Sequence, residues 1–252
     1  MFEMGFVSGG GLASGRTTSV RGRCDLRRES TRMMANMPKV PYKAKGSDKY
    51  EFIDIFNRFY RERIIFINQD IDDETANQTM AVLLFLESED DKAEVQMYIN
   101  CPGGTTTAGL AIYDCMKAMK YPITTLNLGF AAGMGAFLVG AGTPGKRLAL
   151  PNSRFLIQAP SMDNVVRGQA DQIASEVRIV LRQREKIVNG LHNITGRDRN
   201  LIDEEVNRDF YLTAYEAREY GLIDRILQPK VKDSTPIYQD SLYTPAPQGP
   251  SF

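Results

Sequence analysis

Two glycine-rich stretches are the main candidates for a functional site in this sequence: CPGG at residues 101–104 and GFAAGMGAFL at residues 129–138. Glycine lets backbone N–H groups approach a ligand without a side chain in the way. Gly103 and Gly104 could therefore supply an oxyanion donor, and a helix that starts near Gly133 would add a second donor. Hydrolases often place a serine at the sharpest point of such a turn, but this turn has glycine. The stretch is an active site, a former one, or only packing.

Few side chains are available for other chemistry. His192 is the only histidine and hence the only imidazole for proton transfer near neutral pH. The three cysteines, Cys24, Cys101 and Cys115, form no even disulfide framework and have no metal-ligand spacing. A reducing compartment is the simpler interpretation of that pattern. We therefore expect neither a metal nor another cofactor.

Length and composition are those of one globular domain with tails. The chain has 252 residues, of which 42% are hydrophobic and 25% charged, and its formal net charge is zero. Zero net charge gives no electrostatic reason to expect nucleic acid or an anionic membrane as a partner. The longest weakly polar window, residues 123–142, is rich in glycine, and its apolar part is too short for a membrane span.

The two ends differ in composition from the middle. Residues 1–36 contain six arginines, no lysine and only three acids, and they lack the apolar core of a secretory signal. Such a leader resembles an organellar transit peptide or its remnant, and the alternative is a disordered arm that stays on the chain. The Pro- and Ser-rich end predicts a disordered tail. We divide the chain into a leader or arm (1–49), a domain (50–229) and a tail (230–252).

Hydrophobic patterning in the domain predicts strands that alternate with helices. The expected strands span 64–67, 95–100, 123–128, 148–150, 155–157 and 222–227. One helix is expected to start at Asp72 and Asp73, and the others are expected at 110–119, 129–137, 198–206 and 214–220. This alternation predicts βαβ units and a mainly parallel sheet. In such sheets, sites form at the carboxyl ends of strands. Both glycine turns follow strands, so they should share one edge of the sheet.

A long helix is expected at residues 169–193. Its narrow apolar stripe is formed by Ile173, Val177, Val180, Ile187 and Leu191, with Arg184 as an interruption. A helix of this kind projects toward another helix in a partner. The alternative is a core helix with one solvated face.

Eight sequence blocks in a fixed order resemble those of a known family. They are RERIIFINQDID, VLLFLESED, YINCPGG, GLAIYDCMK, GFAAGMGAFLVGAGTPGKR, LPNSRFLIQAP, RGQADQI and RDFYLTAYEAREYGLIDRIL. In order and spacing they are similar to the ClpP family of Clp protease subunits, through nearly all of the domain. The resemblance implies an α/β, crotonase-like ClpP fold of repeated ββα/βαβ units with a projecting long handle helix.

The family is a group of serine proteases, and the resemblance maps its catalytic positions onto this chain. The serine position is Gly133, the histidine position is Gln158 and the aspartate position is Asp209. The oxyanion donors correspond to the backbone N–H groups of Gly104 and Met134. Glycine cannot attack a carbonyl, and a glutamine amide is not a useful base near pH 7. Loss of a nucleophile or its base costs on the order of 10⁶ in turnover number.

The remaining candidate residues are Asp209, its neighbour Arg208 and the single histidine, His192. Asp209 alone would orient a base that is absent, so it is expected to pair with Arg208 or another group, or else to be a solvated surface charge. His192, near the end of the long helix, is expected to cap that helix or to lie on the surface.

The resemblance implies a role without catalysis. Inactive ClpR-type members fill places in mixed heptameric rings with active ClpP-type subunits and other ClpR-type subunits. Two rings stack through the long helices, and an AAA+ Clp chaperone ring feeds substrates. The expected protein is thus a proteolytically inactive hetero-oligomer subunit, in the chloroplast stroma or, as an alternative, in a cyanobacterial-type cytoplasm. Neither nucleic acid nor membrane is an expected partner.

One further departure from the family, one segment with two possible placements and two rival functions remain. The loop 161–167 is about two residues longer than expected for the family, and residues 50–61 are expected near the axial pore or as a helix on the core. One rival is an active hydrolase with a displaced nucleophile, with four candidates: Ser153, Ser161, Thr105 and Cys101. The other rival is a crotonase-type enzyme that acts on an acyl-CoA.

Overall fold

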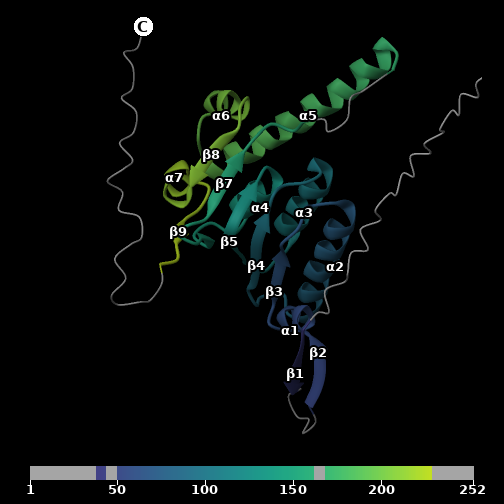
Figure 1. Ribbon diagram of the computed structural model, residues 1–252, viewed down its shortest axis with the longest axis vertical. Helices are drawn as coiled ribbons and strands as arrows, with labels where there is room; N and C mark the ends of the chain where they lie inside the picture. Colours follow the sequence, from purple (N-terminus) through teal and green to yellow (C-terminus); the bar gives the residue numbers. More distant parts are fainter. Residues whose placement is uncertain (1–37, 44–49, 162–167, 229–252) are drawn as a thin grey trace, which may run out of the picture. The chain divides into compact units, whose positions relative to one another are not determined.

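The computed structural model describes residues 38–43, 50–161 and 168–228, all within the compact unit Pro38–Phe252. Most of the expected leader, the lengthened loop at 162–167 and the expected tail lie outside the described residues. Figure 1 shows the arrangement of the helices and strands.

The centre of the described unit is a seven-stranded sheet. Five strands lie in the order β3-β4-β5-β6-β9 and pair in parallel: β3 (Ile64–Ile67), β4 (Val95–Cys101), β5 (Ile123–Ala132), β6 (Arg147–Ala149) and β9 (Arg225–Ile226). The end of β5 also pairs with β7 (Arg154–Ile157), which pairs antiparallel with β8 (Phe210–Thr213). The predicted α/β fold with a mainly parallel sheet is confirmed.

The expected helices are present, and all but the one at residues 199–206, which comes directly after the long helix, follow a strand. They are α2 (Asp73–Glu89), α3 (Thr106–Ala118), α4 (Met134–Gly140), α6 (Arg199–Val206) and α7 (Ala214–Tyr220). At the start of α2, the Asp72 carboxylate accepts a hydrogen bond from the Thr75 N–H at 2.7 Å, as expected of an N-cap. No helix in the described part of the chain has both the length and the apolar character to cross a membrane.

The core lies between the sheet and α2, α3 and α4. Strand β4 alternates fully buried residues with more exposed ones, and every residue of α4 is buried. Large side chains such as Met97, Leu83 and Ile112 are fully buried there, and each contributes about 1.5–3 kcal/mol of transfer free energy. The core thereby fixes the ends of β4 and β5, from which both glycine turns begin.

The expected end of β5 was wrong. The sequence predicted a turn at Gly129, but the strand continues to Ala132 and the turn comes at Gly133. Two asparagine side chains explain the continuation, because Asn127 Oδ1 accepts from the Gly129 N–H and Asn100 Oδ1 from the Phe130 N–H, each at 3.0 Å. They satisfy the backbone across a bulge, after which pairing with β4 resumes at Ala131.

Helix α5 (Ala170–Thr195) has two different halves. Its buried residues all lie in the second half, at Ile187, Val188, Gly190 and Leu191. The first half extends away from the sheet in Figure 1, and Val177 and Leu181 there are 44% and 56% exposed. The predicted projecting helix is confirmed.

Residues near the amino-terminal end of the described chain form a hairpin and a short helix. Strand β1 (Lys39–Lys43) pairs antiparallel with β2 (Tyr50–Asp54), and α1 (Ile55–Arg61) follows. The Phe59 ring packs 4.9 Å from that of Phe66 in β3, which places α1 against the sheet. The expected helix on the core is therefore present from Ile55 onward.

Other boundaries differ from the prediction in smaller ways. Helix α3 begins at Thr106 rather than Leu110, and β9 has two residues instead of six. Strand β8 was not predicted as a strand. Its four residues have no clear alternation, and only their pairing with β7 makes them a strand.

Candidate functional site

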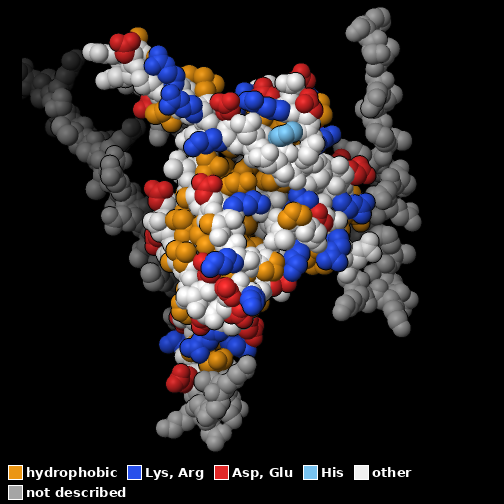
Figure 2. Space-filling view, turned by 180° about the vertical axis from the view of Figure 1, so that it is seen from behind, with side chains coloured by type: hydrophobic (Ala, Val, Ile, Leu, Met, Phe, Trp, Pro, Cys, Tyr) orange, Lys and Arg blue, Asp and Glu red, His pale blue; other side chains and the backbone are white. Residues whose placement is uncertain are grey.

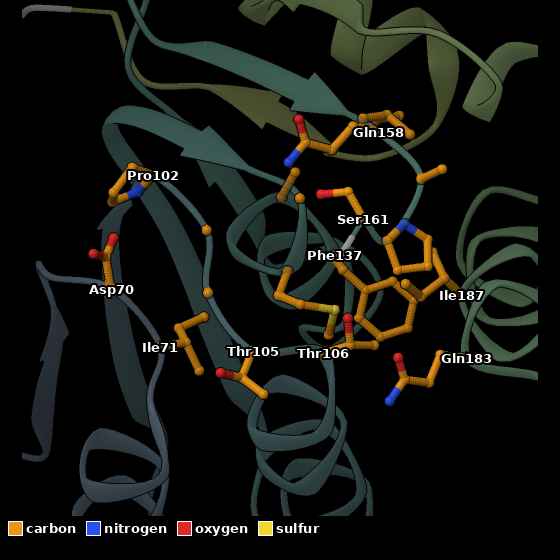
Figure 3. A pocket seen from close by; sticks show the side chains of 18 of the residues that line it. Asp70, Ile71, Pro102, Thr105, Thr106, Phe137, Gln158, Ser161, Gln183 and Ile187 are labelled. Carbon is orange, nitrogen blue, oxygen red and sulfur yellow. The ribbon is translucent and has the colours of Figure 1, made fainter. Parts of the chain in front are cut away.

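A cavity of about 530 Å³ lies at the carboxyl ends of β4 and β5. The CPGG turn, the turn at Gly133, residues 157–161 and one side of α5 line it. Figure 3 shows Gln158 and Gln183 on opposite sides of the cavity, with Phe137 and Ile187 between them. The expectation that the two glycine turns share one edge of the sheet is confirmed.

The CPGG turn can be built only with glycine at position 104. Gly104 has a φ of +139°, and a Cβ there would lie 2.3 Å from the backbone oxygen of Ile71. The neighbours of Gly104 hold Ile71 in a short parallel bridge, because Ile71 N–H donates to Gly103 O and Thr105 N–H to Ile71 O. Within the described chain, the Gly104 N–H has no hydrogen-bond partner, so it is available on the side of the cavity.

The second turn places residue 133 at the sharp junction of β5 and α4. Gly133 has φ +50° and ψ −113°, a conformation that residues with side chains rarely adopt. Its N–H donates to Leu156 O at 2.9 Å, which ties the turn to β7. The next N–H, that of Met134, has no acceptor among the described residues. The turn therefore has the strand-to-helix geometry on which hydrolases expose a nucleophile, but without the nucleophile.

The position of Gln158 relative to Gly133 is the main geometric finding of the site. A Cβ built on Gly133 would lie 3.4 Å from Gln158 Nε2 and 3.8 Å from its Cγ. These are ordinary contact distances, so the space for a side chain at position 133 is present and faces the amide. A glycine and a neutral amide thus stand next to each other at this point of the cavity.

Asp209 lies near Gln158 by strand register but outside the cavity. In the β7–β8 ladder Ile157 is opposite Phe210, and one further step puts Gln158 opposite Asp209. Asp209 is exposed and is not among the residues that line the cavity. In the described part of the chain, neither Asp209 nor Arg208 forms an ion pair, which fits the interpretation of both as solvated surface charges in the single chain.

The lone histidine is not part of the cavity. His192 is exposed in the last turn of α5, with Nδ1 2.5 Å from the Arg197 carbonyl oxygen. Its carbonyl oxygen accepts from Gly196, the left-handed residue that ends α5. Figure 2 shows the histidine at the surface. The expected surface location is confirmed.

The four alternative nucleophiles are not equivalent. Cys101 is fully buried and its Sγ contacts the Gly103 backbone, while burial raises the pKa of its thiol. Ser153 is buried, and its hydroxyl donates to Leu150 O. Thr105 and Ser161 do line the cavity, but no imidazole lies beside them there. A hydroxyl without a base is a poor nucleophile near neutral pH.

Sequence reasoning missed part of the wall. Gln183, Ile187 and Leu191 of α5 line the cavity, although only the apolar stripe of the helix had been noted. Gln183 also donates to the Thr107 hydroxyl at 3.4 Å, so α5 and α3 meet beside the cavity. The spacing of 183, 187 and 191 was the available signal, because residues four apart share one face of a helix.

Comparison with known proteins shows the family to which the sequence is similar. The model of the Clp protease family matches residues 46–230. The chain is 45% identical over 195 residues to the ATP-dependent Clp protease proteolytic subunit 2 of Prochlorococcus marinus (strain NATL2A), a match that spans 77% of this chain and 97% of the relative. It is 44% identical, with the same coverage of both chains, to the ATP-dependent Clp protease proteolytic subunit 3 of Synechococcus sp. (strain CC9605).

A parallel sheet with a strained strand-to-helix turn beside one cavity, and two N–H groups there that have no acceptor among the described residues, has the layout of a hydrolase scaffold. Together with the matches along most of its length, it identifies the chain as a member of the Clp protease family.

Proposed function

We propose that this chain is a ClpR-type, proteolytically inactive subunit of an ATP-dependent Clp protease core. The observation that carries the proposal is the pair Gly133 and Gln158, because a Cβ at position 133 would lie at an ordinary contact distance from the Gln158 amide. A serine and a histidine at these places would form a nucleophile and its base. Hydrogen and an amide cannot take those roles.

The surroundings of this pair support the proposal. The described residues that line the cavity include no histidine, lysine or cysteine that could replace the missing groups. The hydroxyls of the lining are those of Thr105, Thr106 and Ser161, and the described lining has no imidazole or amine to accept their protons; its titratable groups are the carboxyls of Asp70 and Asp72. The two available N–H groups would bind an oxyanion but could not form one.

The assembly is proposed from the exposed half of α5. Ile173, Val177 and Leu181 are partly or largely exposed in the single chain. Exposed apolar side chains at helical spacing fit the apolar side of another helix. We propose that this half of α5 contacts the facing ring, that the subunit shares its own ring with active ClpP-type and other ClpR-type subunits, and that an AAA+ Clp chaperone docks on the assembly.

We also propose a location in the chloroplast stroma, with a cyanobacterial-type cytoplasm as the alternative. The composition of residues 1–36, rich in arginine and poor in acids, supports import into a plastid. Incubation of the full chain with isolated chloroplasts tests it. A shortened, protease-protected product supports the plastid, and a chain that stays outside at full length contradicts it.

The decisive experiment is to purify the tagged chain alone and together with an active ClpP-type subunit. Alone, it should cleave no fluorogenic peptide and should take no fluorophosphonate label. In the complex, the label should appear on the partner, which serves as the positive control. Stoichiometric labelling of this chain by itself would contradict the proposal and favour a displaced nucleophile.

Assembly has its own matched test. Val177→Glu puts a charge on the exposed apolar stripe of α5, while Ser175→Glu puts the same charge on an exposed polar position two residues away. Val177→Glu should reduce the fraction of double rings on size-exclusion chromatography, and Ser175→Glu should leave it unchanged. An equal fraction of double rings for the two variants would show that this stripe of α5 does not form the contact between rings.

A further inference from the structure

The first half of α5 carries apolar side chains that are arranged symmetrically about Val177. Ile173 lies four residues before Val177 and Leu181 four residues after it, so the three share one face of the helix. They are 36%, 44% and 56% exposed in chain order. Figure 1 shows this half of α5 extending away from the sheet. The exposed stripe therefore presents the same spacing of apolar residues in both directions along the helix.

Two charged side chains of opposite sign accompany the stripe at nearly equal distances from its centre. Asp171 lies six residues before Val177 and Arg182 lies five residues after it, and both are exposed. The eleven residues between them make up about three helical turns, so both side chains lie on the same side of the stripe. Within the described chain neither of them forms an ion pair. Both charges are thus available to a partner.

A second, antiparallel copy of this helix matches both arrangements at once. In a two-fold contact, residue i of one copy meets residue j of the other, and residue j of the first meets residue i of the second. If Val177 lies at the centre of such a contact, Ile173 faces Leu181 and Asp171 faces Arg182, twice over. A parallel copy would bring like charges to the same level instead. The order of the charges along α5 therefore favours its own copy in the antiparallel direction.

We propose that the first half of α5 binds the same half of a second copy of this chain, antiparallel and centred on Val177, and that Asp171 and Arg182 select this partner. The inference rests on the proposed function, in which this half of α5 contacts the facing ring. It goes further because it names the chain that is met there and the residues that select it. An exposed ion pair contributes little alone, but contacts that are repeated around a ring reinforce one another.

Two charge reversals test the selection. Asp171→Arg opposed to itself places like charges at both pairs, and so does Arg182→Asp opposed to itself. The two variants opposed to each other restore both pairs, because each then meets the opposite charge. This pattern is specific to a contact between two copies of the chain, since a different partner would not distinguish the mixture from the separate variants.

Single rings that contain one variant and the active ClpP-type subunit are assembled separately and then mixed. Either variant by itself should form fewer double rings on size-exclusion chromatography than the unchanged chain, with an association constant about two- to fivefold lower for each contact. The mixture of the two kinds of ring should recover the double rings. Circular dichroism confirms that both variants are folded.

A cysteine at the centre of the contact gives an independent measurement. Val177→Cys should form a disulfide between two differently tagged copies in the assembled core under mild oxidation, because a residue on a two-fold axis meets its own copy. Ile179→Cys is the matched control, since Ile179 is 48% exposed but lies on the other side of the helix. The unchanged chain, treated in the same way, gives the background from the natural cysteines.

The outcomes separate this inference from the proposed function. A mixture that forms no more double rings than the separate variants would overturn the inference. So would a disulfide through Ile179→Cys that is as abundant as the one through Val177→Cys. In either case the proposed function still stands if the core assembles and this chain takes no fluorophosphonate label. Labelling of this chain by itself would overturn the proposed function.

Discussion

The sheet holds two polar arrangements with opposite character: the ion pair of Arg147 with Asp224, and the cavity around Gly133 and Gln158. Arg147 Nε and Nη2 donate to the two Asp224 oxygens at 3.0 and 2.6 Å, and Nη1 donates to the carbonyl oxygens of Ile194 and Gly221. The backbone N–H groups of Gly145 and Arg147 donate to Asp224 as well. The pair is largely buried and its hydrogen bonds are satisfied.

The cavity is the reverse case. Its two candidate oxyanion donors, the N–H groups of Gly104 and Met134, have no partner in the described chain. The charged residues of the described cavity lining are Asp70 and Asp72. A buried polar group that serves the fold is normally satisfied within the fold, whereas unsatisfied groups at a cavity await a ligand. The difference indicates that the cavity, unlike the ion pair, leaves backbone donors available to a ligand.

The largest effect should come from refilling the site. Gly133→Ser together with Gln158→His puts a hydroxyl and an imidazole where the Cβ geometry leaves room for them. Because loss of such a pair costs on the order of 10⁶ in turnover, even partial recovery should raise peptide cleavage by orders of magnitude over the unchanged chain. Cleavage is measured in a complex whose other subunits have their catalytic serine replaced by alanine.

The single variants are the controls for this change. Gly133→Ser alone lacks a base, and Gln158→His alone lacks a nucleophile, so each should stay near the background rate. A double variant that assembles but takes no fluorophosphonate label would show that Asp209, exposed in the single chain, or the groove itself is no longer placed for catalysis.

The next largest effect should come from breaking the satisfied pair. Arg147→Met leaves the Asp224 carboxylate without its partner and two carbonyl oxygens without a donor. Removal of one member of a largely buried pair should lower the free energy of unfolding by about 3 kcal/mol. Urea denaturation followed by circular dichroism measures the change. The double variant Arg147→Met with Asp224→Leu should recover part of the loss, and a double variant as unstable as the single one would contradict this explanation.

The sequence predicted the parts of this comparison that depend on local patterns. The Ile64–Ile67 and Ala214–Tyr220 elements have the expected bounds, and the position of Gly104 followed from the strand before it. The turn at Gly133 was placed four residues too early because the side chains of Asn100 and Asn127, not local propensity, carry β5 across its bulge. The spacing of Gln183, Ile187 and Leu191 places them on one face of α5, but only the packing of the helix decides that this face lines the cavity.

The next prediction compares the stability cost of replacing a glycine of the cavity lining, Gly104, with that of replacing a glycine outside the lining, Gly145. Gly104→Ala would put a Cβ 2.3 Å from Ile71 O at a φ of +139°, so the CPGG turn must shift. We expect a loss of about 2–4 kcal/mol in the free energy of unfolding from strain and overpacking together. Gly145→Ala is the matched control, because Gly145 has a φ of +85° but nothing within 4 Å of its Cβ position. Its cost should be about 1 kcal/mol, that of the left-handed backbone alone. Equal thermal stability of the two variants would mean that the contact with Ile71 is not the constraint.

The smallest effect is the pH dependence that the ion pair confers. Burial of the Asp224 carboxyl acts to raise its pKa, but hydrogen bonds and the charge of Arg147 outweigh burial and hold the pKa below its usual value. A depressed pKa in the folded state contributes stability that is present above the unfolded value, about 3.9, and is lost as the pH falls through the folded value. Asp224→Asn should therefore lose stability at pH 7 and show a shallower further loss than the unchanged chain below pH 4. Urea midpoints measured from pH 7 to pH 3 give both slopes. Parallel curves for the two proteins would show that the carboxylate of Asp224 is not what couples stability to pH in this range.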